Sequence, residues 1–190
     1  MSKLISVLKE EIHSDISEDH YIIDKILPFV LNSSIDELFS QANDCIDDEN
    51  FSESLIFYDL ILKEDSKNIH ALIDKGTTLQ NLGRIKLAIR SYDKALDISP
   101  DNIDALVNKG SAFHLDKKYS DAISCYDRAL KIDKKCPMAL AYKGLSLAEL
   151  GQLKEAIAYF KNALSIDKHY DLAQFSKDTA QELLKSLQGK

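Results

Sequence analysis

The chain has 190 residues, a length typical of a single domain, and 45% of them are hydrophobic while 29% are charged. Its formal net charge of -7 repels phosphate backbones and anionic headgroups, which argues against nucleic acid and membrane surfaces as partners. With only six glycines and three prolines to form turns, the composition favours helices.

Residues 1–34 are predicted to form a pair of amphipathic helices, one through Leu4, Leu8 and Ile12 and one around residues 22–31. The second stretch is too short and too charged for a signal sequence or a membrane span. We expect the pair to cap the repeats that follow.

A 34-residue pattern then repeats four times without a change of register. The four copies are residues 35–68, 69–102, 103–136 and 137–170. Each copy has a large slot, a small slot four residues later, a second small slot, and an aromatic slot four residues after that. In chain order, the large slot holds Leu38, Leu72, Leu106 and Leu140; the small slots hold Ala42, Gly76, Gly110 and Gly144, then Ser54, Ala88, Ala122 and Ala156; the aromatic slot holds Tyr58, Tyr92, Tyr126 and Phe160.

Each copy is predicted to be two helices joined by a turn, because its apolar residues fall into two blocks with helical spacing. Two helices can cross at about 8–10 Å only where small residues meet. We therefore expect Gly76 and Ala88 to lie at the contact between the two helices of the second copy. Leu72 and Tyr92 then fill the space on either side.

The turn between the two helices needs a residue that adopts a left-handed conformation at low cost, which favours Gly. Gly83 and Gly151 occupy this position in the second and fourth copies. Glu49 and Lys117 occupy it in the first and third copies, so we expect those two turns to be less ideal.

Polar residues mark the beginnings of the first helices. Ser34 and Glu37 form the pattern of a capping box at the first copy. Asn68 and Asn102 precede the first helices of the next two copies, where their side chains can accept from free backbone N–H groups.

The repeat resembles the tetratricopeptide repeat family, whose 34-residue helix–turn–helix units carry large, Gly, aromatic, Ala and Pro slots in a fixed order. The second copy matches this order with Leu72, Gly76, Leu79, Ala88, Tyr92, Ala95 and Pro100. The resemblance covers residues 35–170 and implies an all-α, right-handed superhelical solenoid. It also implies that residues 171–190 form a solvating C-terminal helix, because the terminal unit of a solenoid needs a polar outer face.

One slot departs from the family's pattern. Lys75, Lys109 and Lys143 stand where the family usually has an apolar residue. We expect their stems to lie along the helix and their ammonium groups to stay in water, which leaves the predicted fold unchanged.

In this family the first helices of successive units line a concave groove, which usually takes an extended or helical peptide. Carried over by position, the resemblance places these residues in the groove: Asp36, Phe39, Asn43, His70, Ile73, Asp74, Thr77, Asp104, Val107, Asn108, Ser111, Met138, Ala141, Tyr142 and Leu145. Four of them form an apolar ladder at a constant offset, namely Phe39, Ile73, Val107 and Ala141. The alternative is that this ladder only packs between neighbouring helices.

Charge distinguishes the first copy from the other three. Residues 35–68 hold ten acidic and two basic residues, a net charge of -8. This favours a ligand with a basic segment for the first copy and apolar anchors for the later ones. Family members that grip a peptide's C-terminal carboxylate use a Lys and an Asn. Asn43 matches the Asn, but Phe39 stands where the Lys should be, so this mode is not favoured.

The sequence holds no constellation for catalysis, metal binding or cofactor binding. His13 and His20 have no third ligand, and Cys45, Cys125 and Cys136 form no C-x-x-C pair. We therefore expect no enzymatic activity, no metal and no cofactor. Cysteines of this number and spacing favour a reducing, cytoplasmic location.

Three functional hypotheses remain. The leading one is an adaptor or scaffold that binds a peptide segment of another protein in the groove without catalysis. The second is a structural or assembly protein that acts through self-association. The third is single-stranded RNA binding by helical repeats, which the net charge of -7 argues against.

Overall fold

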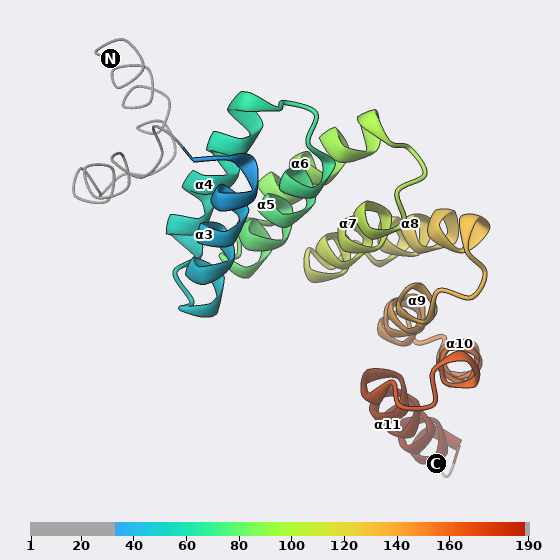
Figure 1. Ribbon diagram of the computed structural model, residues 1–190. Helices are drawn as coiled ribbons and strands as arrows, with labels where there is room; N and C mark the ends of the chain where they lie inside the picture. The colour runs from blue at the N-terminus through green and yellow to red at the C-terminus, as the bar shows by residue number, and fades with distance from the viewer. Residues whose placement is uncertain (1–32, 189–190) are drawn as a thin grey trace. The chain divides into compact units, whose positions relative to one another are not determined.

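The computed structural model describes residues 33–188, and within this range the only regular secondary structure is α-helix (Figure 1). The helical pair predicted for residues 1–34 lies outside the described residues, except for its last two. The chain divides into two compact units, Met1–Ser66 and Lys67–Lys190, and each is described by itself. No helix within residues 33–188 combines the length and the hydrophobicity needed to cross a membrane.

The described part of the first unit, residues 33–66, contains one helix pair, α3 (Ile35–Asp47) and α4 (Phe51–Glu64). α3 begins with the predicted capping box. The Ser34 N–H donates to the Glu37 carboxylate at 2.8 Å, and the Glu37 N–H donates to the Ser34 hydroxyl at 3.3 Å. The pair encloses buried side chains from both helices, including Leu38, Ala42, Tyr58 and Ile61.

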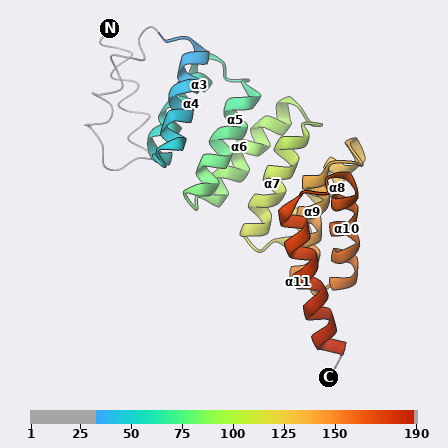
Figure 2. The same ribbon diagram turned by 60° about the horizontal axis from the view of Figure 1, so that its bottom comes forward.

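The second unit contains three helix pairs and a final single helix (Figure 1, Figure 2). The pairs are α5 (Ile69–Asn81) with α6 (Ile85–Ile98), α7 (Ile103–Leu115) with α8 (Tyr119–Ile132), and α9 (Pro137–Glu149) with α10 (Leu153–Ile166); the last helix is α11 (Asp171–Gln188). Each helix packs against the next one in the chain, and the first helices of successive pairs also touch. The predicted solenoid of helix–turn–helix repeats is confirmed.

The first helices of the second unit begin as the sequence predicts. Asn68 Oδ1 accepts from the Ala71 N–H at 3.0 Å, and Asn102 Oδ1 accepts from the Ala105 N–H at 2.8 Å. α9 begins instead with Pro137, which has no N–H to satisfy. Each first helix therefore starts at the same place in its repeat, which keeps the repeats in register.

An aromatic ring faces a glycine in every helix pair of the second unit. The buried rings of Tyr92, Tyr126 and Phe160 lie against Gly76, Gly110 and Gly144, respectively. A Cβ atom built on Gly110 would lie 2.8 Å from Tyr126 Cζ, which is too close for a real contact. The glycine therefore provides the space that the aromatic ring occupies. The sequence predicted instead that the ring would lie to one side of the contact between the two helices.

The turn within each of the four described helix pairs contains a residue with a positive φ angle. The angle is 72° at Gly83 and 76° at Gly151, as predicted, and 59° at both Glu49 and Lys117. A non-glycine residue adopts this conformation at a cost of about 1–2 kcal/mol. The first and third turns thus keep the geometry of the others with a less suitable residue.

The outer face of α11 carries large apolar side chains among its polar ones. Its buried side chains are small: Ala173, Ser176 and Ala180. By contrast, Phe175 is 74% exposed and Leu183 is 49% exposed. The outer face of α11 is therefore partly apolar, because the small residues of this helix are the ones turned toward α9 and α10.

Candidate functional site

The first helices of the second unit form a continuous row, which we call the first-helix face. α5 contacts α7, α7 contacts α9, and α9 contacts α11, which lie side by side in Figure 2. Gln80 of α5 donates from Nε2 to the Ser111 hydroxyl of α7 at 3.2 Å, which links two neighbours in the row. This face carries all the predicted groove residues except those of α3, which belong to the first unit.

The predicted apolar ladder is largely inside the protein. Ile73, Val107 and Ala141 are 7%, 1% and 0% exposed, so they pack between helices and offer little surface to a ligand. In the first unit, Phe39 is partly buried and its ring lies edge-on to Tyr58, with 6.4 Å between the ring centroids. The ladder therefore matches the alternative role of packing between neighbouring helices.

The other predicted residues of the first-helix face reach the surface to different degrees. His70, Thr77, Asp104 and Met138 are exposed; Asp74, Asn108, Ser111, Tyr142 and Leu145 are partly buried. In the first unit, Asp36 and Asn43 are exposed on α3. The accessible surface therefore comes from the residues that flank the ladder.

Burial changes the proton affinity of Asp74, on this face, and of Tyr92, on α6 behind it. The Thr77 hydroxyl lies 3.3 Å from the Tyr92 hydroxyl, and burial raises the pKa of Tyr92 to about 12, so the phenol stays protonated. Burial also raises the pKa of the Asp74 carboxyl, although the neighbouring His70 acts in the opposite direction. These groups can take part in hydrogen bonds, but none of them is arranged as a base next to a nucleophile.

A polar cluster joins the third and fourth repeats. His114 Nδ1 lies 2.9 Å from the Ser146 hydroxyl, and its ring lies edge-on to Tyr119 with 5.2 Å between centroids. The Tyr119 hydroxyl donates to Glu149 at 3.3 Å. Burial lowers the pKa of His114, with Glu149 opposing. Because Ser146 is fully buried, no substrate can reach this serine–histidine pair, and the cluster holds repeats together.

An apolar pocket of about 380 Å³ lies at the C-terminal end of the first-helix face. α9, α10 and α11 line it, and Glu149 is its single charged residue. Its apolar lining includes Leu145, Ala148, Leu153, Phe175 and Leu183. A pocket with mostly apolar walls and few polar groups is typical of a binding site for an apolar anchor.

Leu145 was predicted to lie at this face, whereas the contribution of α11 was not predicted. Phe175 lies 34 residues after Ala141, so it continues the apolar ladder into α11. The 34-residue offset from Ala141 was the signal in the sequence that could have assigned Phe175 to this face. It was overlooked because a terminal solenoid helix is expected to present a polar outer face.

Lys109 and Lys143 form ion pairs instead of keeping their ammonium groups in water, contrary to expectation. Lys143 Nζ donates to Asp127 at 2.6 Å and to the Tyr159 hydroxyl at 2.7 Å, and Lys109 Nζ lies 2.5 Å from Asp93. The contacts with Asp127 and Asp93 join a first helix to the second helix of the preceding repeat, whereas Tyr159 lies on α10, in the same repeat as Lys143. Burial lowers the pKa of Lys143, but the hydrogen bonds and the charge interactions with Asp127 and Tyr159 together raise the pKa above its ordinary value.

Within residues 33–188 no group of three or more His, Cys, Asp or Glu residues is arranged to hold a metal ion. Cys125 is buried, and burial raises the pKa of its thiol, which disfavours the reactive thiolate. Cys45 and Cys136 are partly buried. His13 and His20 lie outside the described residues.

Family models for tetratricopeptide repeats match residues 103–136 and 137–170, and a further model for the same repeat matches residues 78–117. The chain is a tetratricopeptide repeat protein. No curated protein matches its sequence.

Several solved structures share the fold. A structure of MamA is 23% identical, with a TM-score of 0.66, over 78% of this chain and 81% of that chain. MamA from Desulfovibrio magneticus is 20% identical, with a TM-score of 0.65, over 84% and 96%. The first tetratricopeptide domain of Spaghetti (RPAP3), solved with an HSP90 peptide, is 25% identical, with a TM-score of 0.60, over 64% and 96%.

Proposed function

We propose that this tetratricopeptide repeat protein is a non-catalytic adaptor whose first-helix face binds a peptide segment of another protein. The family supports this role, and so does the Spaghetti (RPAP3) structure, in which a domain of the same fold is bound to a peptide. The buried serine–histidine pair and the raised pKa of the Cys125 thiol argue against nucleophilic catalysis.

The proposal rests on a change from polar to apolar side chains along the first-helix face, from α5 to α9. Three equivalent positions hold His70, Asp74 and Thr77 on α5, then Asp104, Asn108 and Ser111 on α7, then Met138, Tyr142 and Leu145 on α9. Side chains that can hydrogen-bond to peptide groups thus give way to side chains that can surround an apolar anchor. One extended segment, polar at one end and apolar at the other, would match this order.

Charge adds a second requirement for the partner. The first repeat, residues 35–68, has a net charge of -8, and Asp36, Asp47 and Asp48 are exposed there. A partner with a basic segment for this unit and apolar side chains for α9 would complement both. A free peptide carboxylate would be a poor ligand for α3, because Phe39 stands where a clamp would need a cation.

The test compares variants of surface residues on the first-helix face with a variant elsewhere. The partner is recovered from the source cells with the tagged protein, its binding segment is mapped, and the segment is titrated by calorimetry. We expect Asn108→Ala and Met138→Glu each to weaken binding at least about fivefold, or roughly 1 kcal/mol. Lys131→Glu, at an exposed position of α8, is the control and should change little.

Ionic strength tests the charge requirement in the same titration. Raising the salt concentration from low to physiological should weaken binding if a basic segment contacts the first repeat, because exposed charge attractions are screened within about 8–10 Å. If Asn108→Ala and Met138→Glu both stay folded and bind at parental affinity, the first-helix face is not the binding surface.

A further inference from the structure

We propose that the apolar surface of α11, together with the adjoining pocket, binds an amphipathic helix of the partner that carries basic residues on one flank. This inference rests on the proposed function and names the class of segment that occupies the C-terminal end of the first-helix face. It concerns Phe175, Leu183 and Leu187, which are 74%, 49% and 59% exposed.

The repeat register indicates that a helix would fit against the exposed surface of α11. Ile73, Val107 and Ala141 occupy one slot of α5, α7 and α9, and each of these helices contacts the next first helix of the row. All three side chains are at most 7% exposed. Phe175 occupies the same slot of α11 but is 74% exposed. A helix that packed on α11 in the same way would bury it.

The spacing of the exposed residues supports the same conclusion. Phe175, Thr179, Leu183 and Leu187 follow one another at intervals of four, so they form one stripe along the helix surface. Thr179 is the one polar residue of the stripe, and its hydroxyl donates to the Phe175 carbonyl of the same helix at 3.0 Å. The stripe leads into the pocket between α9, α10 and α11, which Phe175 and Leu183 help to line.

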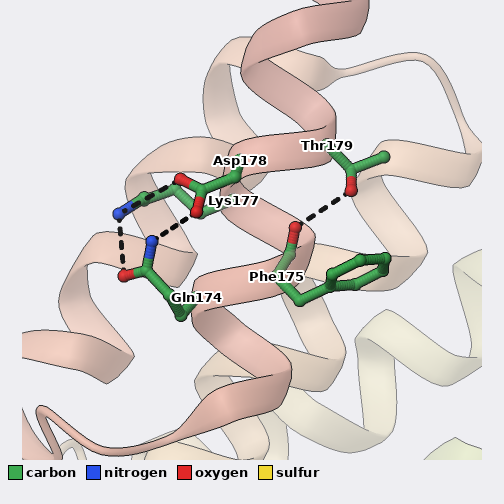
Figure 3. Close-up of polar contacts among 5 residues, drawn as sticks. All are labelled: Gln174, Phe175, Lys177, Asp178 and Thr179. Carbon is green, nitrogen blue, oxygen red and sulfur yellow. Dashed lines mark hydrogen bonds and ion pairs between the residues drawn. The ribbon is translucent and has the colours of Figure 1, made fainter.

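The charges beside the stripe favour a basic partner. Figure 3 shows Lys177 turned away from Phe175, with its ammonium group held by Gln174 at 3.0 Å and by Asp178 at 3.5 Å. The positive charge of this lysine therefore lies beside the Asp178 carboxylate and away from the Phe175 ring. Helical geometry places the exposed carboxylate of Glu182 next to the stripe, and Glu149 lines the pocket. A Lys or Arg on the flank of the bound helix could reach these two carboxylates.

The same charges argue against two other occupants. A second copy that paired through α11 would bring Glu149 and Glu182 of both copies close to one apolar contact, which costs free energy through repulsion. An anionic lipid surface would be repelled by the same carboxylates. A basic amphipathic helix combines apolar contact with charge attraction, so it fits the surface best.

Three synthetic peptides test the proposal by fluorescence anisotropy. The first is an 18-residue helical peptide with leucines along one stripe and lysines on one flank. The second has two central residues replaced by proline, which breaks the helix. The third has glutamate in place of lysine. We expect the first to bind at least tenfold more tightly than the other two. Equal binding of the proline peptide would overturn the helical class, and equal binding of the acidic peptide would overturn the basic one.

Protein variants show where the helical peptide binds. Phe175→Glu and Leu183→Glu should each weaken its binding at least tenfold, and Glu182→Lys should weaken it several-fold at low salt. Ile132→Glu is the matched control, because Ile132 is 44% exposed and lies on α8, which does not line the pocket. Circular dichroism melts confirm that each variant is folded. Parental affinity in folded Phe175→Glu, or no binding of any of the three peptides, overturns the proposal.

Two further measurements separate the alternatives. Sedimentation showing a dimer that Phe175→Glu dissociates would assign the stripe to a second copy, and Phe175-dependent binding to phosphatidylserine vesicles would assign it to a membrane. If the natural partner loses affinity with Met138→Glu but not with Phe175→Glu, only the α11 inference fails. If neither substitution matters, the proposed function fails as well.

Discussion

The ring of Tyr126 fills the space beside Gly110 so closely that an added Cβ atom at residue 110 would lie 2.8 Å from the ring's Cζ atom. Tyr126 is fully buried and its ring stacks on Tyr142, with 6.1 Å between centroids. The ring therefore has no free space into which it could retreat from a larger residue at position 110.

We expect Gly110→Leu to lower the free energy of unfolding by about 1–3 kcal/mol or more through overpacking. Thermal and urea melts followed by circular dichroism measure the change. Ser124→Ala, at an exposed position of α8, is the control and should melt like the parent. A Gly110→Leu protein that melts within error of the parent would show that the helices can separate at no cost.

The left-handed turn at Lys117 predicts a stabilising substitution. With φ at 59°, Lys117→Gly removes steric strain of about 1–2 kcal/mol, part of which is offset by the greater entropy of Gly in the unfolded chain. We expect a net gain of up to about 1 kcal/mol in urea melts. The reverse change, Gly151→Ala, has φ at 76° and should destabilise the protein. If both substitutions raised the free energy of unfolding, or both lowered it, the strain argument would be contradicted.

The ion pair of Lys143 and Asp127 predicts an unequal effect of removing either partner. Asp127→Asn leaves the lysine's buried ammonium with the Tyr159 hydroxyl alone, and we expect a loss of about 1–3 kcal/mol. Lys143→Met removes the buried charge and should cost less. The double variant should be close to Lys143→Met, which chemical denaturation can measure. Additive effects would show that the two side chains do not interact energetically.

The lowered pKa of His114 predicts a loss of stability in acid. Since burial lowers the folded-state pKa below the ordinary value of 6.5, the unfolded chain binds more protons as pH falls. The free energy of unfolding should therefore fall as pH drops below about 6.5 and level off below the folded pKa. The groups around this ring are Tyr119, Ser146 and Glu149.

Urea melts between pH 8 and pH 4.5 test this dependence. His114→Gln should flatten the part of the profile below pH 6.5, whereas His169→Gln, at an exposed position between α10 and α11, should leave it unchanged. An identical profile for His114→Gln and the parent would rule out His114 as the source of the acid sensitivity.

The sequence by itself determined the repeat and the local geometry of each unit. The 34-residue period located the helix pairs, and Ser34, Asn68 and Asn102 marked where first helices begin. Gly83 and Gly151 marked the turns. These features could be predicted because each depends on residues close together in the chain: a cap on an N–H three residues away, and a turn on the φ angle of one residue.

The tertiary structure decided which sides of the helices are available. Periodicity assigns Ile73 and Val107 to the same apolar face of their helices. Each first helix of the solenoid, however, packs against neighbours on two sides, so periodicity does not decide whether that face is buried or exposed to solvent. For the same reason Lys143 meets Asp127 of the preceding repeat instead of water, and α11 turns Phe175 outward. Burial is set by the neighbouring helix, whose position depends on contacts between residues more than a dozen positions apart in the chain.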